Sequence, residues 1–291
     1  MTKKIAYLIF VILKFLDQIV NFIFKKNFLG FLKHYLDKNA YKSIKILGKE
    51  IYFFTPNQIT EWRVNTYFVK EPETLEWINS FDDSKKIIFW DIGANIGLYS
   101  IYAALKHNDC EIISFEPSTS NLRTLSRNIS INNLDNKIKI FTNPLTNQSE
   151  KFLNMKEGQF IEGGALNTFG EKYDFEGHDY KSDMNYQIIG KSINSILDDK
   201  ILEVPNYIKI DVDGIEHLIL QGADKYLNDE NLKSLSIEIN DNFLEQHQSV
   251  LKIMKDYNFK FLHKKNNFKI NEYKKINEYK HDKTYNYVFI R

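Results

Sequence analysis

The sequence predicts an α/β fold in which strands of a parallel sheet alternate with helices. From Lys85 onward, short apolar runs alternate with segments whose apolar residues recur at helical spacing. The first run, 87–90 (IIFW), shows no polar alternation, as expected for a strand buried on both faces. It passes without a gap through a glycine turn into a helix, a connection typical of nucleotide-binding α/β folds.

The turn at 91–97 (DIGANIG) has the composition of a small-molecule cofactor site. Gly93 allows the backbone to turn sharply and to approach a ligand closely, and Gly97 allows the next helix to pack tightly. The start of that helix offers unpaired N–H groups to an anion. A strand-to-helix turn with chance glycines is the alternative, and this motif alone does not decide between the two.

Two later strand ends favour a nucleoside-containing cofactor. The second predicted strand, 111–115 (EIISF), ends at Glu116, where an acidic side chain can accept two hydrogen bonds from ribose hydroxyls. Asn143 follows the third predicted strand, 138–141, at the position from which an amide can reach an adenine ring.

Carboxylates at the next two strands mark a reacting side. The fourth strand, 207–210 (YIKI), ends at Asp211, and Glu238 interrupts the apolar fifth strand, 235–239 (LSIEI). A charged residue inside so apolar a strand is expected to point into a site or to have a partner. His217, on the helix after Asp211, has a pKa suited to proton transfer, but a surface histidine is an equal alternative.

Asp213 and Glu216 precede an apolar helical segment with capping-box spacing. One or both are therefore expected to satisfy helix N–H groups.

Four motifs together resemble the FkbM-type methyltransferase family of S-adenosylmethionine-dependent enzymes. They are FWDIGANIGLYS (89–100), FEPS (115–118), YIKIDVDGIEHLILQGA (207–223) and SIEI (236–239), within a similarity that covers roughly 71–240. The resemblance implies a Rossmann-like fold with a seven-stranded, mostly parallel sheet and an antiparallel last strand. It also implies O-methylation of a hydroxyl on a sugar, glycan or related natural product.

The resemblance further implies roles for single residues. Asp91, Gly93, Asn95 and Gly97 would cradle the methionine part of the cofactor, Glu116 would hold the ribose, and Asn143 would lie near adenine. The usual K-I-D-V-E-G motif appears here with Asp213 in the position of the glutamate, which weakens any role carried over to Asp213.

We hypothesise that Asp211 orients or deprotonates the acceptor hydroxyl, with Glu238 or His217 assisting. In a metal-assisted alternative, Asp211 with Asn240 or Asp241 would hold Mg²⁺, although we assign no metal ligands.

Two other classes of protein stay open. A nicotinamide-dependent oxidoreductase also has an acidic residue after its second strand, but Asn95 replaces the second glycine of its G-x-G-x-x-G motif. A membrane-surface binding module leaves the strand-end carboxylates unexplained.

The N-terminus predicts an amphipathic helix within 1–27. The run 5–13 is continuously apolar, and polar residues then recur on one helix face through Lys25. The uninterrupted run is shorter than the roughly 18 residues of a spanning helix, and no signal-peptide cleavage site follows it. Peripheral contact with the cytoplasmic membrane face through residues 5–24 is one interpretation; packing on the rest of the protein or on a partner subunit is the other.

Residues 28–84 are expected to form an accessory cap with a hairpin around Gly48, and 85–291 the methyltransferase domain. As a lid or wall over the cofactor, the cap would bring Arg63 and Glu71 nearby, although ordinary surface charge accounts for each. The glycine-rich segment 148–190 is predicted to form loops with a short hairpin and to recognise the acceptor.

Two polar segments receive no chemistry. His178 between Glu176 and Asp179 could bind a metal, but a solvated loop is the favoured interpretation. The tandem KINEYK repeat at 269–280 is interpreted as a solvated extension of a hairpin loop.

Composition bounds the partners. A net charge of +1 among 291 residues argues against bulk electrostatic binding of nucleic acid. The single Cys110 excludes an internal disulfide and a cysteine-based zinc site, and fits a cytoplasmic protein. The oligomeric state is not predicted.

Overall fold

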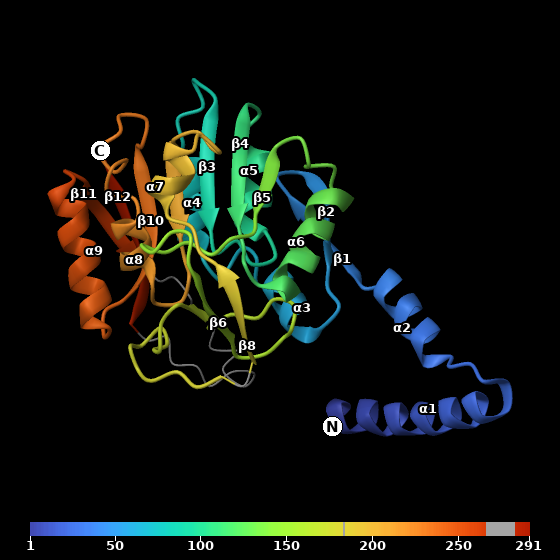
Figure 1. Cartoon of the computed structure of the whole chain (residues 1–291). Coiled ribbons are helices and arrows are strands. Elements are labelled where there is room, and N and C mark those ends of the chain that lie inside the picture. The colour runs from blue at the N-terminus through green and yellow to red at the C-terminus, as the bar shows by residue number, and fades with distance from the viewer. Residues whose placement is uncertain (183, 266–282) are drawn as a thin grey trace.

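The five strands that the sequence predicts and two further strands lie side by side in one central sheet (Figure 1). They are β3 (Ile87–Ile92), β4 (Cys110–Phe115), β5 (Ile138–Phe141), β9 (Tyr207–Ile210), β10 (Ser234–Asn240), β11 (Lys260–Lys265) and β12 (Thr284–Ile290). The computed structural model describes residues 1–182, 184–265 and 283–291, and within these the sheet has seven strands in the order β11-β12-β10-β9-β3-β4-β5. The predicted repeat at 269–280 lies outside the described residues.

The strand directions confirm the predicted Rossmann-like topology. Every pair from β10 to β5 is parallel, whereas β12 runs antiparallel to both of its neighbours. Parallel strands place their carboxyl ends at one edge, which is where open α/β sheets bind ligands. The predicted antiparallel last strand is therefore confirmed.

Helices cover both faces of the sheet (Figure 1). They are α4 (Pro72–Asn79), α5 (Leu98–Lys106), α6 (Thr119–Ile131), α7 (Ile193–Asp198), α8 (Glu216–Gln221) and α9 (Leu244–Asp256). Because side chains alternate along a strand, Phe89 and Trp90 of β3 point to opposite faces. Phe89 packs in the core shared with α4, α5 and α6, and Trp90 in the core shared with α7, α8 and α9.

The segment before β3 is built into one of these faces. After α2 (Leu29–Lys38), which buries none of its residues, it contains the predicted hairpin of β1 (Tyr41–Ile46) and β2 (Lys49–Phe54), and then α3 (Gln58–Asn65). Phe53 and Ile78 are fully buried in the same core as α5 and α6. The Phe54 N–H also donates to Asn128 Oδ1 of α6 at 2.7 Å. The cap therefore shares its core with the domain that it covers.

The segment 148–190 contains more regular structure than predicted. Beyond the expected hairpin of β6 (Phe152–Glu157) and β8 (Met184–Ile189), β7 (Thr168–Phe169) pairs with the other edge of β6. The sequence pattern does not indicate all of these strands, because the glycines in the loops between the strands favour an irregular segment. This small sheet lies beyond the carboxyl ends of β3 and β4 (Figure 1).

The N-terminal helix α1 (Thr2–Phe24) extends away from the sheet together with α2 (Figure 1). It buries none of its residues, and its mean hydropathy reaches 1.8 over 18 residues. The prediction of insufficient length for spanning considered only the uninterrupted apolar run. The helix continues beyond that run through all 23 of its residues, so its length and composition suffice to cross a membrane.

Candidate active site

A cleft opens at the carboxyl ends of β3, β4, β5 and β9 and has about 610 Å³ of empty space. Apolar side chains, among them Phe115, Leu145 and Ile219, line much of it. Glu116 and Asp211 are among the polar groups that reach it. An apolar cleft with a few convergent polar groups is typical of a small-molecule site.

The glycine turn borders this cleft in the way that the sequence predicts. Gly93 (φ +84°) lies so close to the end of β9 that a Cβ there would meet the Asp211 carbonyl oxygen at 1.8 Å. Asn95 has a φ of +51°, a left-handed conformation that asparagine tolerates better than most residues. Its Nδ2 donates to the Gly164 carbonyl at 2.7 Å, while its Oδ1 is buried and accepts no hydrogen bond.

Asp91 lies behind the turn and is not among the described residues that line the cleft. It is fully buried in β3 and accepts a hydrogen bond from Ser100 Oγ of α5 at 2.5 Å, whereas its Oδ1 has no partner. Burial raises the pKa of this carboxyl group. Asp91 thus links β3 to the first turn of α5, and its predicted contact with the cofactor stays a prediction.

Glu116 lines the cleft at the end of β4 and ties the turn to it. Its two carboxylate oxygens accept the N–H groups of Asn95 and Ser118, each at 2.8 Å. Glu116 is only 4% exposed, and this burial, with a smaller effect of nearby Glu157, raises its pKa to about 8. The carboxyl group is therefore mostly protonated at neutral pH, and its predicted contact with a ribose stays a prediction.

The small sheet and its loops form a wall of the same cleft. Asn143 lines the cleft and donates from Nδ2 to the Ile189 carbonyl of β8 at 3.1 Å. The Gly164 carbonyl accepts from both Asn95 and Asn121. The segment predicted to recognise the acceptor therefore also holds the glycine turn.

Asp211 stands at the end of β9 with a buried lysine as its counter-ion. Lys209 lies two residues earlier on the same face of the strand, is 1% exposed, and places its Nζ 2.6 Å from Asp211 Oδ2. Burial opposes ionisation of Asp211, but the charges of Lys209 and Lys70 outweigh it and lower its pKa to about 2. The predicted catalytic carboxylate is therefore ionised at neutral pH.

Two further carboxyl groups, those of Glu238 and Asp213, interact with Asp211, and their pKa values shift upward whereas that of Asp211 shifts downward. Burial and the nearby Asp211 raise the pKa of Glu238 well above its usual value and that of Asp213 to about 6. Charge repulsion between neighbouring carboxylates has this effect, because it favours the protonated form of one of them.

The capping-box prediction for Asp213 is wrong. Asp213 Oδ2 accepts the N–H groups of Leu166 and Asn167, and the residue has a φ of +62°. The chain thus turns before the helix begins at Glu216, whose own carboxylate accepts the N–H groups of Val212 and Gly214.

A second cavity with about 340 Å³ of empty space lies on the other side of the glycine turn and shares Gly93, Asn95 and Asp211 with the cleft. Arg63 and Lys70 line it. The interpretation of Glu71 as ordinary surface charge is wrong, because its side chain is 6% exposed and pairs with Lys70. The positive charge of Lys70 thus compensates the buried carboxylate of Glu71.

His217 is held away from these groups. It is 2% exposed on α8, and its ring packs edge-on against Phe243. Burial lowers its pKa, and neither cavity counts it among the described residues that line it. The geometry does not support an assisting role for His217.

Oxygens suggested for a metal-assisted reaction have other partners. Asp241 is engaged by Lys264 and by the Tyr287 hydroxyl, and Asn240 Oδ1 accepts the N–H of Asn242. Asp211 is paired with Lys209. The arrangement thus offers Mg²⁺ no ready set of free oxygens among these residues.

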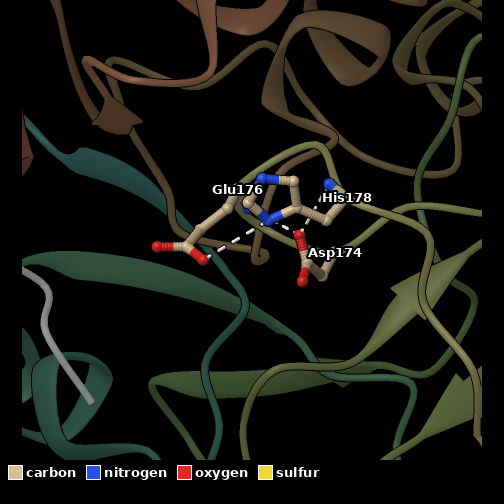
Figure 2. Close-up of side chains that lie close together, drawn as sticks. All are labelled: Asp174, Glu176 and His178. Carbon is tan, nitrogen blue, oxygen red and sulfur yellow. Dashed lines mark hydrogen bonds and ion pairs between the residues drawn. The ribbon is translucent and has the colours of Figure 1, made fainter.

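Figure 2 shows a second group of possible metal ligands, Asp174, Glu176 and His178. Asp174, and not Asp179 as the sequence suggests, is the aspartate that lies near the other two. Asp174 Oδ1 accepts the N–H groups of Glu176 and His178 at 2.9 and 3.0 Å, and His178 Nδ1 lies 3.6 Å from Glu176 Oε2. These contacts close a local turn in which the possible ligand atoms of the three residues lie within 4.8 Å of one another.

The sequence pattern does not identify Lys70 as a site residue, and it assigns no role to Lys209. A usable signal existed for Lys209, because a lysine inside an apolar strand is as unusual as Glu238. It also occupies the same face as Asp211 through the two-residue period of a strand. Lys70 has no comparable signal, since it lies on a connection between helices.

Comparisons with known proteins agree with this geometry. The model of the Methyltransferase FkbM domain matches residues 91–261. Methyltransferase sdnD of Sordaria araneosa is 28% identical over 154 residues, which cover 46% of this chain and 60% of that protein. The chain thus spans less than two thirds of that relative's length.

Solved structures of similar fold are distant. Methyltransferase FkbM from Methylobacillus flagellatus KT has a TM-score of 0.42 and 17% identity, covering 89% of this chain and 58% of its own. An rRNA methylase from Streptococcus thermophilus has a TM-score of 0.42 and 12% identity, covering 75% and 94%. The prediction of no nucleic-acid partner gains no support from such structures and rests on net charge alone.

The family match is the finding that identifies the chain. It covers more than half of the sequence and includes the glycine turn, Glu116, Asp211 and Glu238. It supports methyl transfer that depends on S-adenosylmethionine and disfavours the oxidoreductase alternative. The chain belongs to the FkbM methyltransferase domain family.

Proposed function

We propose that this chain is an S-adenosylmethionine-dependent O-methyltransferase that acts on a hydroxyl of a sugar, glycan or related natural product. One observation carries the proposal: the glycine turn and Glu116 border the same cleft as the ionised Asp211. Cofactor-binding groups and a proton acceptor are therefore adjacent. The family resemblance supports the hydroxyl acceptor class.

The residues of the cleft fit the cofactor. Its apolar walls suit an adenine ring, and the Glu116 carboxyl group at the rim suits ribose hydroxyls. Asn95 Oδ1 is a buried acceptor without a partner beside the glycine turn. When bound, S-adenosylmethionine supplies a methyl group activated by a positively charged sulfur.

The chain's own residues then orient the acceptor and take its proton. Asp211 accepts a hydrogen bond from the acceptor hydroxyl and directs its oxygen. A carboxylate with a pKa of about 2 is a weak base, but it suffices, because the hydroxyl becomes strongly acidic as its oxygen forms the new bond. Burial and the nearby Asp211 raise the pKa of Glu238, and in its protonated form this group can donate a second hydrogen bond to the acceptor.

Calorimetry followed by an acceptor screen tests this function. S-adenosylmethionine is expected to bind and NAD is not. Radiolabelled methyl donor should then label one class among sugar nucleotides, glycans and RNA. Binding of NAD alone would contradict the proposal, and labelling of RNA alone would contradict the acceptor class.

Chelation distinguishes the metal-assisted alternative. Asp211 is already neutralised by Lys209, so we expect turnover to be unchanged by EDTA. Loss of turnover with EDTA and its recovery with Mg²⁺ would favour the alternative.

We also propose that α1 binds the cytoplasmic membrane surface. Its apolar side chains, such as Phe10 and Phe22, are exposed, and lysines flank both of its ends. The full chain should sediment with anionic vesicles, and a chain lacking residues 1–26 should not. Equal sedimentation of the two would contradict this role, and resistance to alkaline extraction would indicate a spanning helix.

A further inference from the structure

The second cavity continues the main cleft past the glycine turn, since the two share Gly93, Asn95 and Asp211. A ligand whose nucleoside part lies beside Glu116 would reach the second cavity with any group that extends beyond the turn. What the second cavity can bind therefore indicates what lies at the far end of that ligand.

Three cations line the second cavity, and two of them are neutralised. Lys209 is paired with Asp211, and Lys70 with Glu71. Arg63 belongs to none of the ion pairs found among the described residues. Its Nε donates to the Gly163 carbonyl at 2.7 Å, which leaves the two Nη groups without a recorded partner. Arg63 is therefore the cation of this cavity without a direct ion pair, and its charge acts at longer range on Asp211 and Asp213, whose pKa values it lowers.

The position of Arg63 is fixed by the packing of α3 against the loop at 162–164. It lies on α3, whose N-terminus has a capping box of Asn57 and Thr60. Asn57 Nδ2 also donates to the Glu162 carbonyl at 3.0 Å, and a Cβ on Gly163 would lie 3.0 Å from Thr60 Cγ2. The close approach of α3 to the 162–164 loop thus positions the guanidinium before any ligand binds, which reduces the entropy lost on binding.

The start of α5 also lines this cavity and likewise favours an anion. Leu98 and Tyr99, which open the helix, line it, and Gly97 at the N-cap provides no side chain to cap the first N–H groups. Uncapped helix N–H groups favour an anion, and a guanidinium binds a carboxylate with two parallel hydrogen bonds. A carboxylate is therefore the group that suits this cavity.

We propose that Arg63 binds the α-carboxylate of the methionine part of S-adenosylmethionine, so that the cap segment completes the cofactor site. The inference rests on the proposed function, because it takes the adenosine part to lie beside Glu116. It gives α3 a role in cofactor binding in addition to its packing in the core through Val64. Arg63 is 30 residues before Gly93 in the sequence, outside the span matched by the family model.

Calorimetry with two ligands tests the assignment without knowledge of the acceptor. S-adenosylhomocysteine carries the carboxylate, whereas 5′-methylthioadenosine keeps the nucleoside and sulfur but lacks the amino-acid end. Arg63→Met should weaken S-adenosylhomocysteine binding about 10- to 100-fold and leave methylthioadenosine binding within about 2-fold. Arg63→Lys, which keeps the charge without the planar fork, should lose less.

Arg127→Met is the matched control. Arg127 stacks on Phe54 with its guanidinium 4.2 Å from the ring centroid and is not among the described residues lining either cavity. Neither ligand should bind this variant differently from the wild type. Equal loss of both ligands in Arg63→Met, or loss of neither, overturns the inference while the proposed cofactor stands. A wild type that binds neither ligand overturns the proposed cofactor and this inference together.

Discussion

Glu116 and Asp211 stand at the ends of the two strands that flank β3, and both reach the same cleft, yet their pKa values shift in opposite directions. Glu116 has only N–H donors and the nearby Glu157, so burial raises its pKa to about 8. Asp211 has Lys209 at 2.6 Å, and its pKa falls to about 2. The neighbouring charge, more than burial, thus decides which carboxylate is ionised and which half of the cleft can accept a proton.

Removing the lysine should break this contrast with the largest effect. Lys209→Met leaves Asp211 in the protein without its buried counter-ion, so we expect the free energy of unfolding to fall by about 3–5 kcal/mol in urea titrations. Lys139→Met, which removes a more exposed partner of Glu111, should cost less than about 1 kcal/mol. Similar losses in both variants would contradict a special role of Lys209.

The pH dependence of stability should show the other half of the contrast. The folded-state pKa of Glu116 lies near 8, above its usual 4.5, so its contribution is complete below about pH 4.5 and is lost as pH rises toward 8. Glu216, with a pKa of about 7, acts in the same direction. Asp211, whose pKa is lowered, loses its contribution only below about pH 4.

We therefore expect Glu116 alone to lower the free energy of unfolding by on the order of 3 kcal/mol between pH 5 and pH 8. Glu116→Gln should flatten this fall, because its side chain does not ionise. Urea titrations at several pH values measure it, and an unchanged slope in the variant would show that Glu116 is ordinary in its titration.

Asp211→Asn tests the reacting half. The amide keeps the size of the side chain but cannot take the acceptor proton, so we expect turnover to fall about 100-fold with little change in S-adenosylhomocysteine affinity. Glu238→Gln should cost less, because the raised pKa of Glu238 favours its neutral form, which the amide resembles. Full turnover in both variants, with the acceptor found by screening, would falsify the catalytic assignment.

Glu116→Gln tests the binding half with the smallest expected effect. The amide replaces one carboxyl oxygen by an NH2 group that cannot accept a hydrogen bond, which should weaken S-adenosylhomocysteine about 10-fold in calorimetry and leave turnover at saturation nearly unchanged. Glu111→Gln, on β4 and bonded to Lys86 and Lys139, is the matched control and should bind normally. A loss of turnover as large as that of Asp211→Asn would mean that the two halves are not functionally separate.

The sequence predicts which site residues lie at the strand ends, but it does not predict the partners of their side chains. The glycine turn, Glu116, Asn143 and Asp211 are found at the cleft because parallel strands bring their carboxyl ends to one edge. The predicted surface charge of Glu71 and the predicted capping role of Asp213 are wrong for a common reason. Each is engaged by a partner, Lys70 or the 166–167 backbone, whose approach depends on how loops and helices pack.

The sequence by itself determined the sheet and the location of its site. Strands buried on both faces require uninterrupted apolar runs, and the residues that end those runs must lie together at the sheet edge. Only the tertiary structure decided the charge states at that edge and the contribution of Arg63. Both depend on distances of a few ångströms between segments far apart in the chain, over which electrostatic interactions change steeply and which no local pattern encodes.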